Sequence, residues 1–247
     1  MSLIQSVFIV SVVGIVGTGL GGVFVAALGT PTKRVLSFLL GFAGGIMVAV
    51  VAFDLMPEAF EIGGTFITLA SFLIGCVATM AIDLFIPHTH HVSSEGLSSK
   101  LERTSLVIAM GIAMHNIPEG LAVGAGLNAG SRIGLRVALM IMLHNIPEGI
   151  AVAAPLKVLR KSSSSIIRAA SLAGTPTLIG GLIGMLIGGV SPTVLAASIS
   201  FAAGSMLFIT FDELIPDCQA LAEKHSGTLG AVAGVVVNIV LSTLVGS

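Results

Sequence analysis

The hexapeptide His-Asn-Ile-Pro-Glu-Gly occurs twice in this sequence, at residues 115–120 and 144–149. Within each copy the histidine and the glutamate are four residues apart, so they share one face of a helix. His115, Glu119, His144 and Glu148 together supply two imidazoles and two carboxylates, a ligand set that suits zinc, iron, manganese or cobalt. The copies are about one membrane helix and a short loop apart. We therefore expect them to face each other from neighbouring antiparallel helices, near the middle of a bilayer.

The other residues of each copy support this interpretation. Each asparagine adds a carbonyl oxygen about 100° around the helix, where it could meet a second ion or orient a carboxylate. Each proline cannot donate a backbone hydrogen bond, which predicts a kink and a free carbonyl beside the ligands. Each glycine lets a neighbouring backbone come close. These residues are Asn116 and Asn145, Pro118 and Pro147, and Gly120 and Gly149.

A purely structural alternative is that these polar side chains only hydrogen-bond across helices. A charge at the bilayer centre costs roughly 2.5–3.5 kcal/mol even on the lower insertion scales. Serine or glycine would serve packing at a lower cost. The repetition of two carboxylates and two imidazoles therefore favours metal binding.

Acidic residues lie near the ends of two other apolar segments. Asp54 and Glu58 belong to the first of them, and Asp212 and Glu213 to the second. They could concentrate cations at the two mouths of a pathway, as rings of acids do in cation pores. The alternative is that they are helix-end acids that face water.

Two further features each allow two interpretations. His88, His90 and His91 lie in the polar stretch 88–103 and could bind metal at low affinity, or could belong to a merely polar loop. Met47 is central in an apolar segment and could be a soft thioether ligand. A lone methionine in an apolar helix usually serves packing instead.

The composition predicts an all-α membrane protein. Of 247 residues, 55% are hydrophobic and 9% are charged, whereas soluble domains carry about 25% charged residues. The apolar runs are continuous rather than alternating, which favours helices over a barrel. The net charge of −1 indicates no nucleic-acid partner, and the lipid bilayer is the expected surroundings. We expect a single domain, 1–247, with eight spanning helices near 3–28, 35–57, 65–87, 104–127, 133–156, 166–189, 193–215 and 227–246.

The basic residues predict the orientation. Most of them follow the first, third, fifth and seventh helices, so these connections, including 88–103, should be cytoplasmic and both termini extracytoplasmic. The segments that end at Pro57 and Pro216 carry acids at matching positions. This match predicts inverted repeats of helices 1–3 and 6–8 around helices 4–5, which is typical of transporters.

At the doubled HNIPEG the sequence resembles the ZIP (Zrt-, Irt-like protein) family of metal-ion transporters, closest to its prokaryotic GufA-like branch. The resemblance covers the whole chain. It implies a 3+2+3 helix arrangement, import of Zn²⁺, Fe²⁺, Mn²⁺ or related ions such as Co²⁺ and Cd²⁺ across the plasma membrane, and often a homodimer. It implies no catalytic cofactor and no enzymatic activity. The transport site that it implies contains His115, Asn116, Glu119, His144, Asn145 and Glu148, and Met47 matches a methionine of some prokaryotic members.

The sequence departs from the family pattern at one position. Many members carry a glutamate before a proline in helix 6, which bridges a second metal. Here Thr175 precedes Pro176, and a hydroxyl binds a cation more weakly than a carboxylate. We therefore predict one main metal site, built around Glu119 and Glu148.

Two other functions stay open as alternatives. A membrane metal sensor or scaffold would use the same ligands without any flux. An intramembrane metalloprotease would be expected to carry HExxH, with a base beside the first ligand. The HNIPE sequence has asparagine at that position and proline at the next but one, which disfavours the protease.

Overall fold

The computed structural model describes the chain except for residues 1, 86–96, 130, 187–190, 222–223 and 247. All regular elements of the described chain are helices. In chain order they are α1 (Leu3–Ser11), η1 (Val12–Val16), α2 (Gly17–Ala27), α3 (Lys33–Ala49), η2 (Val50–Leu55), α4 (Met56–Phe85), α5 (Leu97–Ala129), α6 (Ser131–Val158), α7 (Ser163–Ala173), α8 (Thr175–Leu186), α9 (Pro192–Ile209), η3 (Thr210–Leu214), α10 (Ile215–Leu221) and α11 (Ser226–Gly246).

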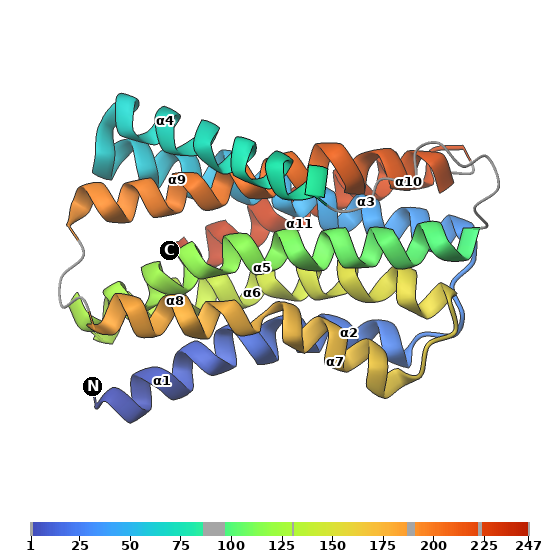
Figure 1. Ribbon diagram of the computed structural model, residues 1–247, viewed down its shortest axis with the longest axis horizontal. Helices are drawn as coiled ribbons and strands as arrows, with labels where there is room; N and C mark the ends of the chain where they lie inside the picture. The colour runs from blue at the N-terminus through green and yellow to red at the C-terminus, as the bar shows by residue number, and fades with distance from the viewer. Residues whose placement is uncertain (1, 86–96, 130, 187–190, 222–223, 247) are drawn as a thin grey trace.

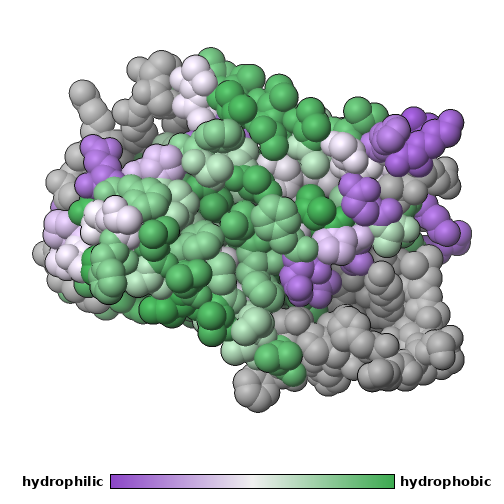
Figure 2. All heavy atoms as spheres, turned by 90° about the horizontal axis from the view of Figure 1, so that it is seen from above, coloured by the Kyte–Doolittle hydropathy of each residue, from purple (hydrophilic) through white to green (hydrophobic). Residues whose placement is uncertain are grey.

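Seven helical stretches of the described chain are long and apolar enough to cross a membrane, which agrees with an all-α membrane protein. Large apolar side chains such as Ile4, Phe66 and Leu186 are more than three-quarters exposed. In water this exposure would be unfavourable, whereas lipid is a matching solvent. Figure 2 shows hydrophobic side chains over the middle of one face, with hydrophilic ones mostly toward its ends.

One of the seven stretches, Lys33–Ala81, is 49 residues long and reverses direction within α4. Gly64 has φ 66° and ψ 176°, a backbone conformation that interrupts the helix and suits glycine. The Thr68 hydroxyl donates to the Ala59 carbonyl at 2.9 Å. Nine residues of straight helix would span about 13 Å, so this hydrogen bond requires the chain to fold back at Gly64.

The helices form two groups, which lie in the lower and upper halves of Figure 1. In the first group, α5 packs on α6 and α8, and α2 packs on α6 and α7. In the second group, α4 packs on α9, and α3 packs on α11 and α10. The groups meet mainly where α5 lies against α9 and where α3 lies against α6.

The closest helix approaches occur within each group. A Cβ on Gly149 of α6 would collide with the backbone of Thr18 in α2, and one on Gly41 of α3 would collide with the backbone of Gly227 in α11. Between the groups, Gly111 of α5 instead meets the flexible side chain of Ile209. Backbone therefore packs against backbone inside each group, as glycine-rich membrane helices do.

Three of the helical elements are π-helical turns, η1, η2 and η3. Two of them, η2 and η3, end two residues before Pro57 and Pro216, and the helix continues past each proline. We expected helices near 35–57 and 193–215 to end at these prolines, whereas they run on to Gly64 and Leu221. A widened turn before the proline relieves the clash between its ring and the carbonyl four residues earlier.

Candidate metal site

The two HNIPEG copies lie on adjacent helices, as their spacing predicts. The first is in the middle of α5 and the second in the middle of α6, and these helices pack against each other. The six polar side chains of the two copies are all buried, with exposed fractions of 9% or less. The sequence thus places two imidazoles and two carboxylates in the interior of the bundle.

The imidazoles and carboxylates pair across the two helices. His115 Nε2 lies 2.8 Å from Glu148 Oε1, and His144 Nε2 lies 3.2 Å from Glu119 Oε1. Each histidine therefore contacts the glutamate of the other copy. This crossed pairing brings all four side chains to one place between α5 and α6.

The same cluster contains polar atoms that have no hydrogen-bond partner. Glu119 Oε2, Glu148 Oε2 and His115 Nδ1 are buried and unpartnered among the described residues. Leaving such atoms unpaired is costly. One ligand atom from each of His115, Glu119 and Glu148 lies within 4.8 Å of the other two. Carboxylate oxygens and an imidazole at these separations form a donor set that fits a divalent transition metal.

The asparagines of the two copies use their amide groups to bind backbone carbonyls. Asn145 Nδ2 donates to the Val13 carbonyl in η1 at 3.0 Å, and Asn116 Nδ2 donates to the Ala173 carbonyl at the end of α7 at 3.0 Å. Both carbonyls lie where a helix is interrupted, which makes them available. The Oδ1 atoms of both asparagines are buried and have no partner among the described residues.

The glycines of the two copies permit close backbone contacts, as predicted. A Cβ on Gly120 would collide with the Thr177 backbone of α8, in the same way that Gly149 excludes one beside Thr18. The ligand-bearing segments of α5 and α6 are therefore held against α8 and α2. Such backbone contact fixes the positions from which the ligands project.

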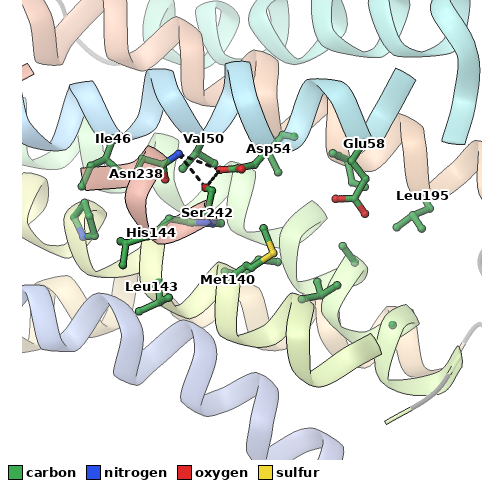
Figure 3. Close-up of a pocket in the computed structure, with 18 of the residues that line it drawn as sticks. Ile46, Val50, Asp54, Glu58, Met140, Leu143, His144, Leu195, Asn238 and Ser242 are labelled. Atoms are coloured by element: carbon green, nitrogen blue, oxygen red, sulfur yellow. Dashed lines mark hydrogen bonds between the residues drawn. The ribbon is translucent and has the colours of Figure 1, made fainter. Parts of the chain in front are cut away.

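A cavity of about 370 Å³ leads toward this cluster (Figure 3). His144 and Pro147 of α6 line it on one side, and Asp54 and Glu58 line it on the side of η2 and α4. Glu58 is exposed, so the cavity reaches the protein surface. The structure thus brings two of the predicted mouth acids and the second HNIPEG copy into one cavity.

The cavity also contains two polar residues of α11 that the sequence analysis did not identify. Asn238 Nδ2 donates to Asp54 Oδ2 at 3.1 Å, and Ser242 Oγ donates to the same oxygen at 3.0 Å. The sequence contains a pattern from which these two residues could have been predicted. Asn238 is polar within a long apolar run, and Ser242 follows four residues later on the same helix face.

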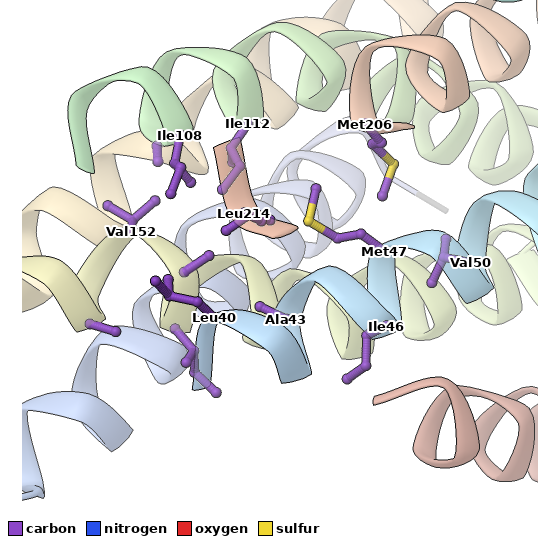
Figure 4. Close-up of a cluster of buried hydrophobic side chains, with 14 of the residues drawn as sticks. Leu40, Ala43, Ile46, Met47, Val50, Ile108, Ile112, Val152, Met206 and Leu214 are labelled. Carbon is purple, nitrogen blue, oxygen red and sulfur yellow. The ribbon is translucent and has the colours of Figure 1, made fainter. Parts of the chain in front are cut away.

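The structure does not bring the other predicted mouth acids to this cavity. Asp212 and Glu213 lie in η3, and the last residue of this turn, Leu214, belongs to an apolar cluster with Leu40 and Ile112 (Figure 4). This cluster is part of the buried core of the bundle.

Met47 belongs to this apolar cluster (Figure 4). It is 1% exposed, and its sulfur accepts a weak hydrogen bond of 3.8 Å from the Thr210 hydroxyl. Met47 does not line the cavity that His144 lines. Its contacts in this structure are those of a packing residue.

Two sequence predictions concern other regions. The loop histidines His88, His90 and His91 lie outside the described residues. The Thr175 hydroxyl, at the position where many family members carry a glutamate, donates to the Leu172 carbonyl of α7 at 2.7 Å. The Thr175 hydroxyl therefore already has an acceptor, at the junction of α7 and α8.

The chain is similar to known proteins over most of its length. The family model described as ZIP Zinc transporter matches residues 91–242, which contain both HNIPEG copies. The zinc transporter ZupT of Escherichia fergusonii is 34% identical over 226 residues, covering 87% of this chain and 88% of that protein. The ZupT proteins of Salmonella newport and Salmonella heidelberg are 34% identical over 223 residues, covering 86% of this chain and 87% of theirs. The chain therefore belongs to the ZIP family of zinc transporters.

Proposed function

We propose that this protein carries divalent transition-metal ions, zinc first among them, into the cytoplasm through the cluster between α5 and α6. Membership of a transporter family makes it a multi-pass membrane transporter and not an enzyme. The observation that carries the proposal is the pair of buried carboxylate oxygens, one each on Glu119 and Glu148, that have no protein partner beside two imidazoles. A cation is the partner that would satisfy them.

The proposed ligands are the six polar side chains of the two copies. Glu119, Glu148, His115 and His144 bind the ion directly, replacing its water as it enters. The Oδ1 atoms of Asn116 and Asn145 are unpartnered and add neutral oxygens. Fe²⁺, Mn²⁺, Co²⁺ and Cd²⁺ are further candidates, because imidazole and carboxylate together suit several divalent ions.

The proposed topology has eight membrane crossings. The reversal at Gly64 divides the longest apolar stretch into two crossings, and the other six stretches add one each. The matching positions of η2 and η3 before their prolines support inverted repeats around α5 and α6, in a 3+2+3 arrangement.

The proposed orientation places the basic end of the protein in the cytoplasm. The start of α3 and the ends of α6 and α10 lie at the right of Figure 1, and Lys33, Lys157 and Lys224 lie at or next to these helix ends. Both chain termini lie toward the opposite side (Figure 1). The cavity with Glu58 then opens outward, in a plasma membrane.

The proposed transport cycle requires one of the two helix groups to move. The ion enters past Asp54 and Glu58, binds between α5 and α6, and leaves past Asp212 and Glu213. In this structure the apolar cluster around Ile112 and Leu214 lies beside η3, so release requires this cluster to separate. A relative movement of the two groups would do this, because α5 meets α9 at Gly111 through the flexible side chain of Ile209 rather than through backbone. Met47 would act as a ligand only when the cluster opens.

The proposal is tested with purified protein in liposomes that contain a zinc-sensitive dye. Wild-type protein should admit Zn²⁺, and Glu119→Gln and His144→Ala should each reduce the initial rate at least about tenfold, since each removes one ligand of a buried site. Gln219→Ala, an exposed substitution at the end of α10, serves as the control. Influx of Fe²⁺, Mn²⁺, Co²⁺ and Cd²⁺ gives the ion preference.

The same experiment separates the alternatives. Equal rates in the wild type and both variants would contradict the site. Wild-type protein that binds zinc but admits none would instead indicate a sensor or scaffold.

A further inference from the structure

Asn238 is an unusual residue for its position in the fold. It lies in the middle of α11, a helix that has fewer buried residues than any other candidate span of the described chain. Yet the Asn238 side chain is only 4% exposed, and it faces the cavity rather than lipid. An amide side chain makes insertion of a helix into the membrane less favourable. The position of Asn238 beside the cavity therefore indicates a functional role.

The contacts of Asn238 and Ser242 converge on one atom. Both side chains donate to Asp54 Oδ2, at 3.1 and 3.0 Å, and Asn238 also lies 3.4 Å from Ser242 Oγ. Among the described residues no donor reaches Asp54 Oδ1. The two donors therefore hold the carboxylate by one oxygen and leave the other available to a cation.

The surroundings of Asp54 make this arrangement effective. Most of the cavity wall is apolar, including Ile46, Val50 and Met140 (Figure 3). An ion in such a low-dielectric passage interacts strongly with each charge that it meets. Asp54 and His144 line the same cavity from opposite helix groups (Figure 3).

We infer that Asn238 and Ser242 are positioning residues that orient the Asp54 carboxylate as a relay ligand, from which an incoming divalent cation passes to His144. This inference rests on the proposed transport function and deepens it. The hydrogen bonds favour one rotamer of the Asp54 carboxylate. They act on capture of the ion from outside, so they set the zinc concentration that half-saturates uptake rather than the maximal rate.

The test is a mutant cycle with zinc influx into liposomes as the readout. Asn238→Leu keeps the number and branching of the side-chain heavy atoms and removes the Nδ2 donor, and it should raise the half-saturating zinc concentration about tenfold, with the maximal rate changed less than about twofold. Ser242→Ala should raise the half-saturating zinc concentration about threefold. Ser242→Thr keeps the hydroxyl and should have the wild-type half-saturating concentration. Thr243→Val is the matched control on α11, because the Thr243 hydroxyl donates only to the Ile239 carbonyl of its own helix.

The decisive arm repeats Asn238→Leu in an Asp54→Asn background. If Asn238 acts through the carboxylate, this second substitution should add no further change to the half-saturating concentration. An additional loss of the same size would show a merely structural role and overturn the inference. Wild-type-like kinetics of Asn238→Leu would also overturn it while leaving the proposed transport function intact, whereas absence of influx in the wild type would contradict the transport function itself.

Discussion

His115 Nε2 lies 2.8 Å from Glu148 Oε1 on the neighbouring helix, although Glu119 shares a helix with His115. The second pair, His144 and Glu119, is crossed in the same way. The cluster is therefore a property of two helices together, and neither copy of the hexapeptide makes it alone. The coupling free energy of each pair can be measured in the metal-free protein.

The crossed pairing predicts which residues are energetically coupled in the metal-free protein. In a double-mutant cycle, His115→Ala and Glu148→Ala should be coupled by about 1–3 kcal/mol, because each single change leaves a buried partner without its hydrogen bond. His115→Ala with Glu119→Ala should be coupled more weakly. Thermal unfolding in detergent with a chelator present gives the four stabilities of each cycle. A larger coupling for the pair within one helix would contradict the observed geometry.

Zinc should stabilise the folded protein through the unpartnered carboxylate oxygens. At a free concentration one hundred times the dissociation constant, a ligand that binds only the folded state adds about 2.7 kcal/mol. Glu119→Gln and Glu148→Gln should each lose most of this gain, whereas Gln219→Ala should keep it. The measurement is the unfolding temperature with and without zinc.

The number of bound ions should be one per chain. The Thr175 hydroxyl is already donated to the Leu172 carbonyl, and threonine offers no carboxylate for a second ion. Elemental analysis after removal of free zinc, or calorimetric titration, gives the stoichiometry. Two tightly bound ions that both disappear in Glu119→Gln would refute the single site.

The glycine that follows Glu148 should be intolerant of even one added carbon. Gly149→Ala places a Cβ into the Thr18 backbone, so α6 must shift away from α2. We expect a loss of about 1–3 kcal/mol from overpacking, which exceeds the helix-propensity gain of about 1 kcal/mol for alanine over glycine. Gly29→Ala, where an added Cβ meets nothing within 4 Å, is the control. Equal unfolding temperatures for the two variants would be inconsistent with this packing.

The amide of Asn145 should matter for the shape of the N-terminal helix. Asn145→Leu removes the donor to the Val13 carbonyl in η1 and leaves that carbonyl buried without this partner. A loss of about 1–3 kcal/mol is expected for an unsatisfied buried acceptor. The unfolding temperature in chelator measures this loss without any contribution from metal. An unchanged value would mean that η1 needs no support from α6.

The sequence predicts the clustering of the two hexapeptides better than it predicts the cavity beside them. The positions of His115 and Glu119 four residues apart define a shared helix face, and the repeat places a second such face on the next helix. The partner of each histidine depends on the relative height and rotation of α5 and α6, which spacing alone does not specify. The position of Asp54 near a helix end predicts a pathway acid, whereas residue spacing does not predict its contact with Asn238, because the two residues lie far apart in the chain.

The helix boundaries were less predictable for a different reason. Pro57 and Pro216 were expected to end their helices, since proline removes a donor and its ring clashes with the preceding turn. The π-helical turns η2 and η3 accommodate this clash and let the helix continue. Such turns arise from local packing, and hydrophobic periodicity does not reveal them.

All four proposed imidazole and carboxylate ligands project from α5 and α6, and these helices belong to the same tightly packed group, whereas the proposed relay carboxylate of Asp54 belongs to the other. A displacement between the groups would therefore leave the bond angles around the ion unchanged. The coordination geometry of the ion and the opening of the apolar cluster that contains Leu214 would then depend on different residues. Substitutions at the junction of α5 with α9 should therefore change the rate of transport more than the preference among ions.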